Sequence, residues 1–312
     1  MNVYLPIADM SINLFLVVGI GALVGFLSGL FGVGGGFLLT PLMMMIGIPP
    51  AVAAASDSNQ IVAGASSGAF AHWRMGNVDF KMGLTILVGG IAGGTLGVQV
   101  VKILRAVGNF EFAMKLIYVF MLGLVGGAML IESLSTLRKI RVEVSAAPPQ
   151  FSEPRLSRLF RRLPLQMTFR KSRLKTSAIF PFAIGFAVGF LAAMLGVGGG
   201  FIMIPAMIYI IGMPTITAVG TDLFQIVLTS ANVTFQQAMT NHTVDILLAL
   251  CLLLGSTFGA QIGARASKLF RGEQIRVLLS VIVLAMMVKL LLDLVLTPDN
   301  LISFAKGVSG GH

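Results

Sequence analysis

The sequence predicts an all-α protein that crosses a membrane many times and consists of two homologous helical repeats. Hydrophobic residues make up 56% of its 312 residues and charged residues only 11%, with a mean hydropathy of +0.93. A soluble domain carries about 25% charged residues, so this composition does not suit a water-exposed surface. The two halves also present the same motifs in the same order, which indicates an internal duplication.

Each half contains the same glycine-rich run. Residues 25–37 are GFLSGLFGVGGGF, and residues 189–201 are GFLAAMLGVGGGF. Further pairs follow in the same order: Pro41 with Pro205, Gly47 with Gly212, Asp57 with Asp222, Gln60 with Gln225, Asp79 with Asp245, and Gly89, Gly93 and Gly97 with Gly255, Gly259 and Gly263. We therefore expect membrane repeats at 12–131 and 178–296, separated by a linker at 132–177.

Each repeat is expected to contain five helices. A first helix runs to the glycines, and a short apolar helix near 37–48 or 201–211 follows. At 1.5 Å per residue, the short helix is too brief to cross a ~30 Å hydrocarbon core, so it either crosses incompletely or re-enters. The hydrophobic runs predict longer helices at 51–73, 82–101 and 110–131, and at 214–238, 244–264 and 274–296. The total is eight full-length helices and two short ones.

The linker at 132–177 is strongly basic and contains eleven of the 22 Lys and Arg residues. Basic loops between membrane spans face the cytoplasm, so we expect a cytoplasmic linker. A further role at anionic lipid or with a partner protein is the alternative interpretation of its charge. Nucleic acid is not an expected partner.

The distribution of charge between the other loops predicts that the repeats are inverted. Arg74 and Lys81 flank the loop after the third element of the first repeat, whereas the equivalent loop at Thr240–Thr243 has no Lys or Arg. The next loop of the second repeat has Arg265, Lys268 and Arg271, against Lys102 and Arg105 in the first repeat. Opposite charge patterns are typical of inverted-repeat transporters, in which each repeat crosses an odd number of times. The loop at Thr240–Thr243 would then be external.

The glycine runs are the first candidate site. Consecutive glycines permit positive φ and weaken a helix, which favours a break between two half-helices. Backbone N–H groups at the start of the second half-helix can then bind an anion. Close helix packing is the alternative role of these glycines. The candidate residues are Gly34, Gly35, Gly36, Gly198, Gly199 and Gly200.

Polar residues in the third helix of each repeat form the second candidate site. Uncharged donors at helical spacing can bind a partly desolvated solute, although they also serve as hydrogen bonds between membrane helices. The candidate substrate-binding residues are Asn59, Gln60, Thr221, Gln225 and Asn232.

Asp57 and Asp222 lie beside these polar residues. A carboxyl group within the membrane is costly and is therefore a candidate for ion coupling. The alternative is that each caps a helix that begins after Pro49-Pro50 or Pro214. The sequence contains no Ser/His/Asp grouping, HExxH motif or set of metal ligands, so neither an enzyme nor a cofactor is expected.

The duplicated glycine motif, the Asp-x-x-Gln elements at Asp57 and Asp222, and the R-x-G-x-V-D segment at Arg74–Asp79 resemble the sulfite exporter TauE/SafE family of membrane permeases. This resemblance covers both repeats but not the linker. It implies transport of small sulfur-containing anions, such as sulfite or organosulfonates, without ATP hydrolysis.

We therefore expect a secondary transporter of small anions that works by alternating access, with an anion channel as the alternative. The expected location is a bacterial inner membrane. The expected partners are the lipid bilayer and the anion, and a homo-oligomer is compatible with the sequence.

Overall fold

The computed structural model describes residues 2–31, 36–140, 165–169, 171–172, 174–266 and 272–296. The first repeat contains β1 (Asn2–Leu5), β2 (Met10–Asn13), α1 (Leu14–Phe31), α2 (Gly36–Met45), α3 (Pro50–Arg74), α4 (Phe80–Ala106) and α5 (Phe110–Ile140). The second contains β3 (Gln166–Phe169), β4 (Leu174–Ser177), α7 (Ile179–Leu195), α8 (Gly200–Pro205), the π-helix η1 (Ala206–Ile211), α9 (Thr215–Gln236), the π-helix η2 (Gln237–Asn241), α10 (Ile246–Ala266) and α11 (Gly272–Val295). The predicted helical fold class, with its two repeats, is confirmed.

The glycine run of the second repeat interrupts the helix as predicted. In the second repeat α7 ends at Leu195 and α8 begins at Gly200. Gly198 and Gly199 have φ values of +69° and +88°, in the left-handed region that residues with a Cβ rarely adopt. In the first repeat α1 ends at Phe31 and α2 begins at Gly36, while Gly34 and Gly35 lie outside the described residues.

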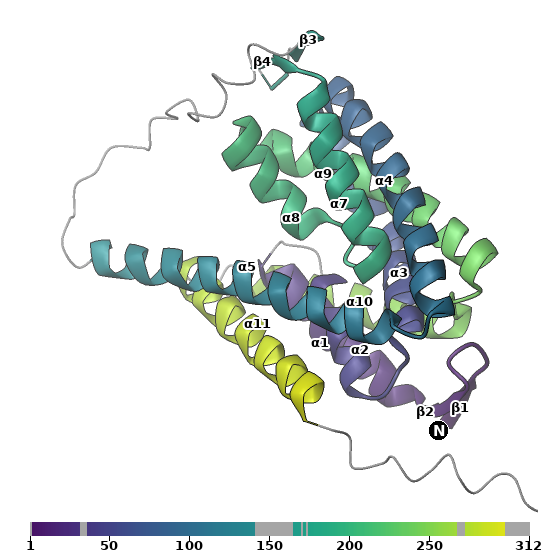
Figure 1. Cartoon of the computed structure of the whole chain (residues 1–312). Coiled ribbons are helices and arrows are strands. Elements are labelled where there is room, and N and C mark those ends of the chain that lie inside the picture. The colour runs from purple at the N-terminus through teal and green to yellow at the C-terminus, as the bar shows by residue number, and fades with distance from the viewer. Residues whose placement is uncertain are drawn as a thin grey trace, which may run out of the picture.

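Helices of one repeat pack in pairs with helices of the other (Figure 1). The first helix of each packs along the fourth helix of the other, α1 on α10 and α7 on α4, while α3 packs on α9 and α5 on α11. Glycines make the first two contacts close. A Cβ on Gly255, Gly259 or Gly263 of α10 would overlap the carbonyl oxygens of Val18, Ala22 and Phe26, respectively. In α4, Gly89 and Gly93 lie in the same way against the carbonyls of Phe182 and Phe186. The glycine spacing therefore serves close backbone packing.

The two short helices meet near the centre of the molecule. Phe37 of α2 and Phe201 of α8 are equivalent residues, and their rings stack at a centroid distance of 4.1 Å with an angle of 6° between planes. Both rings are buried. Stacked aromatic rings contribute contact energy beyond the burial of their surface. This contact holds the two glycine breaks close to each other.

Two hairpins extend the repeats in a way that the helical periodicity did not indicate. Each precedes the first helix of one repeat and docks on the other repeat, and Figure 1 shows them at opposite ends of the molecule. Asp245, before α10, accepts a hydrogen bond on Oδ2 from the Ile7 backbone N–H at 3.2 Å. Asp79, before α4, accepts hydrogen bonds on Oδ2 from Ser172 N and Oγ at 3.0 and 2.7 Å.

The same two aspartates cap the helices that follow them. Oδ1 of Asp79 accepts from Met82 N at 3.2 Å, and Oδ1 of Asp245 accepts from Leu248 N at 3.1 Å. Each Val-Asp pair found in the sequence is therefore a junction between repeats. Since α5 runs to Ile140 and the second hairpin occupies 166–177, the range 132–177 contains regular structure at both ends and not only a linker.

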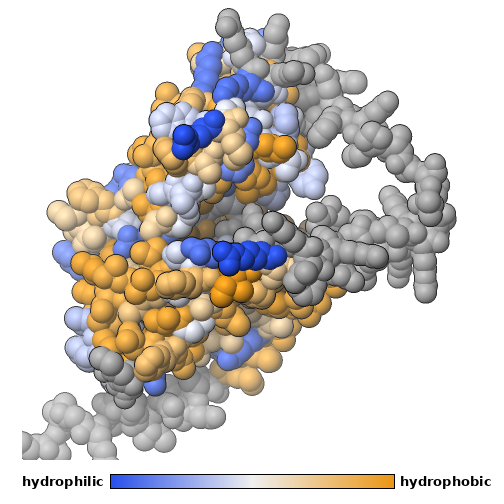
Figure 2. Space-filling model, turned by 180° about the vertical axis from the view of Figure 1, so that it is seen from behind, coloured by the Kyte–Doolittle hydropathy of each residue, from blue (hydrophilic) through white to orange (hydrophobic). Residues whose placement is uncertain are grey.

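Five helical segments in the described part of the chain are long and apolar enough to cross a membrane: 80–106, 110–131, 215–241, 246–263 and 277–295. Of the eight full-length helices that we expected, α1 and α7 are shorter, and α3 is long but more polar because one of its faces lines a cavity. Large apolar side chains stand on the outer surface, where Phe120 is 72% and Phe258 66% exposed. Figure 2 shows one such face, mostly apolar in its lower part, with hydrophilic residues more frequent toward its upper end.

Candidate functional site

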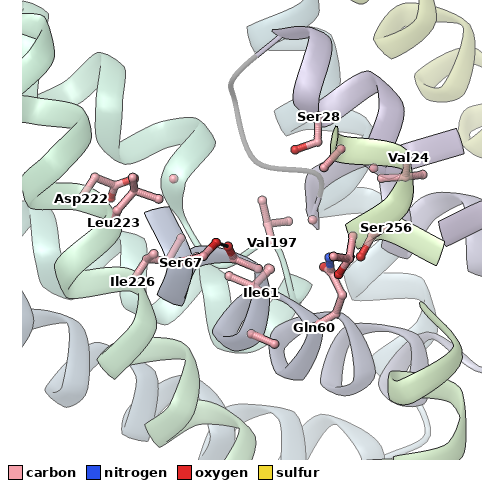
Figure 3. A pocket seen from close by; sticks show the side chains of 18 of the residues that line it. Val24, Ser28, Gln60, Ile61, Ser67, Val197, Asp222, Leu223, Ile226 and Ser256 are labelled. Carbon is pink, nitrogen blue, oxygen red and sulfur yellow. Dashed lines mark hydrogen bonds between the residues drawn. The ribbon is translucent and has the colours of Figure 1, made fainter. Parts of the chain in front are cut away.

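A cavity of about 610 Å³ lies between the repeats. Its walls come from α1 and α3 of the first repeat and α9 and α10 of the second, with residues at both glycine breaks (Figure 3). This volume is within the range of small-molecule binding sites. Its polar lining side chains are Ser28, Gln60, Ser67, Asp222, Ser256, Thr257 and Gln261.

The charge of this lining is unusual for an anion site. Among the described residues of the lining none is Lys, Arg or His, and Asp222 is the one carboxylate. Figure 3 shows Asp222 at one end of the cavity and Gln60, Ser256 and Ser28 toward the other, with Ile61 and Val197 between them. The cavity therefore offers neutral hydrogen-bonding groups at one end and a carboxyl group at the other.

Gln60 is the predicted residue with the clearest position in the cavity. Its Nε2 donates to Ser256 Oγ at 2.7 Å, which joins α3 to α10. Ser256 Oγ in turn donates to the Leu253 carbonyl at 3.2 Å. Asn59 is partly buried beside Gln60 but is not among the lining residues.

The glycine breaks reach the cavity through their last residues. Gly36 and Gly200, the first residues of α2 and α8, both line it. A Cβ on Gly36 would lie 2.5 Å from Ile61 Cδ1 and 3.1 Å from the Val197 carbonyl oxygen. Gly198 and Gly199 lie behind this wall, against Ile61 and Val188, respectively.

The polar residues predicted in α9 mostly contact other protein groups. Thr221 Oγ1 accepts a hydrogen bond from the Asp79 backbone N–H at 3.0 Å. Gln225 Nε2 donates to Asp222 Oδ1 at 2.8 Å, and its Oε1 accepts from Thr229 at 3.0 Å. Asn232 accepts from Gln236 at 3.1 Å. The lining residues do not include Thr221, Gln225 or Asn232.

Asp57 and Asp222 are equivalent in sequence but have different surroundings. Asp57 is fully buried, away from the cavity lining, and its Oδ2 accepts from Thr40 Oγ1 at 2.8 Å. Its Oδ1 has no hydrogen-bond partner among the described residues. Asp222 lines the cavity beside Gly200. Neither caps its helix, because the first turns of α3 and α9 contain no acidic residue.

Sequence reasoning missed the contribution of α10. Ser256, Thr257 and Gln261 line the cavity, and Ser28 of α1 faces the same space. The available signal was the placement of polar side chains among the glycines of an otherwise apolar span. In the described part of the chain, no three His, Cys, Asp or Glu side chains gather as metal ligands would.

Comparison with known proteins adds the family. Residues 17–290 match the family described as Sulfite exporter TauE/SafE. The chain is 26% identical to the probable membrane transporter protein YunE of Bacillus subtilis, over 86% of this chain and 94% of that protein. It is 27% identical to the probable membrane transporter protein YjnA of the same organism, over 90% of this chain and 100% of that protein. No solved structure matches the chain.

A plant protein shares a shorter segment. The sulfite exporter TauE/SafE family protein 1 of Arabidopsis thaliana is 39% identical over 64 residues, which are 20% of this chain and 14% of that protein. The two Bacillus relatives, by contrast, align over both repeats of this chain. The expected resemblance is therefore confirmed over the whole duplicated unit.

Proposed function

Because the chain belongs to the sulfite exporter TauE/SafE family of membrane transporters, we propose that it is a secondary transporter of small anions, sulfite or organosulfonates, that works by alternating access. Its relatives are membrane transporters, which favours a role without enzymatic activity. We place it in a bacterial inner membrane, with the basic linker at 132–177 on the cytoplasmic side.

The observation that carries this proposal is the cavity between the repeats. Gln60 and Ser28 offer neutral donors, and the first residues of α2 and α8 face the same space. Neutral donors and backbone N–H groups suit an anion that must be bound and then released, because they attract it without trapping it by full opposite charge. Irregular backbone at membrane depth is tolerated where it lines such a cavity.

Alternating access is supported by a difference between the two sides of the molecule. The cavity is lined by α3 and the α1–α10 pair, together with residues of α8 and α9. On the equivalent side, α9 packs directly on α4: a Cβ on Gly90 would lie 2.9 Å from Thr229 Oγ1, and one on Gly94 would lie 3.0 Å from Val233 Cγ2. The contact of α3 with the α1–α10 pair thus borders a cavity, whereas the contact of α9 with α4 is closely packed. We propose that rocking of the α1–α10 pair against the α4–α7 pair exchanges these states.

Counterflow in proteoliposomes tests the proposal. Vesicles loaded with unlabelled sulfite, ethanesulfonate, sulfate or acetate are diluted into a trace of the same labelled anion. A carrier produces transient accumulation of label for its substrates, and we expect this for sulfite or ethanesulfonate. Flux that shows no acceleration by anion on the opposite side would indicate a channel. Absence of flux for all four anions would refute the proposed substrate class.

A further inference from the structure

The cavity has a carboxyl group where the proposed substrate carries negative charge. An ionised carboxylate and an anion in one small, weakly polarisable space repel each other strongly. In the part of the chain that the structure describes, no lining residue supplies a positive charge that could compensate both. The proposed anion transport therefore needs a way to remove the charge of Asp222 while the cavity is occupied.

The carboxyl group of Asp222 is held through one of its oxygens, which leaves the other oxygen able to bind a proton. Gln225 Nε2 holds Oδ1 at 2.8 Å, and Gln225 is itself fixed by Thr229 at 3.0 Å. Oδ2 points toward the first residue of α8, since a Cβ on Gly200 would lie 3.0 Å from it. Among the described residues no hydrogen bond to Oδ2 is found, so this oxygen is free to bind a proton from the cavity.

Asp57 is not placed to exchange a proton with the cavity. Its Oδ2 is bonded to Thr40 of the short helix α2, and the side chain is fully buried outside the cavity lining. The position equivalent to Thr40 in the second repeat is Ile204, which directly precedes Pro205 as Thr40 precedes Pro41, and Ile204 lines the cavity. The second repeat therefore lacks the hydroxyl that would draw Asp222 into the protein interior.

The other charged and titratable groups on the described elements packed against α9 are not among the residues that line the cavity. His72 lies beside Gly220 of α9. Gly220 is two residues from Asp222 and therefore faces another side of the helix. On the described elements packed against α9, the remaining groups are Asp57 (bonded to Thr40), Arg74 (over the Phe70 ring), Asp79 (bonded to Ser172), Lys81 (to the Thr168 carbonyl), Lys102 (exposed), Arg105 (to the Asn241 carbonyl) and Tyr209 (exposed).

We propose that Asp222 binds a proton whenever an anion occupies the cavity, so that this transporter moves one proton together with each anion. The carboxylate takes up the proton as the anion binds and releases it as the anion leaves. Cotransport with a monovalent anion would then move no net charge. This inference rests on the proposed anion transport and assigns its coupling to Asp222 and not to Asp57.

Calorimetry on the purified full-length protein tests it. Titration with ethanesulfonate, an anion that carries no proton near neutral pH, is repeated in buffers with different ionisation enthalpies. The buffer dependence of the heat gives the number of protons taken up per anion bound. Sulfite is titrated in the same way, after the protons that the free anion itself exchanges have been subtracted. The proteins compared are the wild type, Asp222→Asn, Asp222→Glu and Asp57→Asn.

At a pH above the titration of Asp222, where this carboxyl group is ionised in the anion-free protein, the wild type is expected to take up close to one proton per anion. As pH rises through the titration of Asp222, its affinity should fall about tenfold per pH unit. Asp222→Asn should bind without proton uptake and with an affinity independent of pH. Asp222→Glu and Asp57→Asn should both keep the uptake. Because the wild-type measurement needs no variant, the test stands even if one substitution impairs folding.

Several results would overturn the proposal. Anion binding to the wild type without proton uptake would refute the inference and leave the proposed function intact, whereas failure of both anions to bind would refute both. Proton uptake that is lost in Asp57→Asn but kept in Asp222→Asn would place the coupling in the first repeat. Tighter binding of 2-aminoethanesulfonate than of ethanesulfonate, lost in Asp222→Asn, would make Asp222 a ligand for a substrate ammonium group.

Discussion

The third helices of the two repeats, α3 and α9, are equivalent in sequence and position but differ in what they pack against. Gly64 follows Gln60 by four residues, as Thr229 follows Gln225. A Cβ on Gly64 would meet only Gln60 Nε2, at 3.7 Å, which leaves open space toward α10. Thr229 instead fills the space between α9 and α4 and is 2% exposed. The cavity thus lies on the side where the helix carries glycine.

The difference extends to the charged groups. In the first repeat Thr40 holds Asp57 inside the protein, and Gln60 is free to line the cavity. In the second repeat Gln225 holds Asp222 at the cavity wall. The two repeats thus share one scaffold, but the first borders the cavity with Gln60 and the second with the carboxyl group of Asp222. Variants that make one repeat resemble the other test this division.

The largest effect is expected from Gly64→Thr, which gives α3 the residue of α9. The branched side chain would enter the cavity beside Gln60 and occupy space that the anion needs, and overfilling of this kind costs on the order of 1–3 kcal/mol. Anion affinity should then fall by roughly tenfold to a hundredfold. Equilibrium binding to the purified protein measures this, with Gly64→Ala as the milder control. Wild-type affinity in a folded Gly64→Thr protein would show that the anion binds elsewhere.

Thr40→Val should mainly reduce stability. It keeps the shape of the side chain but removes the hydroxyl that bonds Asp57 Oδ2 at 2.8 Å. An unsatisfied buried polar group costs about 1–3 kcal/mol of unfolding free energy. Thermal unfolding in detergent measures the loss. Ile204→Val, at the equivalent position of the second repeat, is the control and removes only one methyl group. Equal stability of Thr40→Val and wild type would mean that Asp57 does not depend on Thr40.

Gln60→Ala and Gln225→Ala should distinguish a residue that binds the anion from a residue that stabilises the fold. Gln60 lines the cavity, so its loss should weaken anion binding about tenfold, the equivalent of one hydrogen bond. Gln225 is 2% exposed and bonds Asp222 and Thr229, so its loss should lower the melting temperature more than that of Gln60. Paired binding and melting measurements decide this. The reverse pattern would exchange the roles that we assign to the two glutamines.

Ser172→Ala is the smallest change and makes the second hairpin resemble the first. Ser172 precedes β4 by two residues, and the residue that precedes β2 by two is already Ala8. The substitution removes the 2.7 Å hydroxyl bond to Asp79 but keeps the backbone bond. We expect a loss of about 0.5–1.5 kcal/mol in unfolding free energy. Chemical denaturation measures it, and an unchanged midpoint would show that the hydroxyl bond contributes nothing to this junction.

Sequence alone predicted the helices, the glycine breaks and the family, because membrane spans and duplication leave strong periodic signals. It did not predict the hairpins, which are only four residues per strand and docked by single aspartates. It also treated Asp57 and Asp222 as equivalent. Their difference depends on Thr40 and Ile204, which lie on another helix, and no local pattern in α3 or α9 contains that information. Inversion of the repeats relative to the bilayer stays a prediction.

Solute is expected to reach the cavity beside the α1–α10 pair and not beside the equivalent α4–α7 pair. Ser28 and Ala192 occupy matched positions in α1 and α7, since each lies three residues after the first glycine of its run. Ser28 lines the cavity, whereas Ala192 is 3% exposed. Single cysteines at these positions, in a Cys251→Ala background, differ little in volume from the native residues.

The decisive measurement is the rate at which a small hydrophilic thiol reagent modifies each cysteine, with and without ethanesulfonate, which does not react with the reagent. We predict that Ser28→Cys reacts quickly and is protected by the transported anion, while Ala192→Cys reacts slowly and is not protected. Fast, anion-protected labelling of Ala192→Cys, with none at Ser28→Cys, would contradict the account.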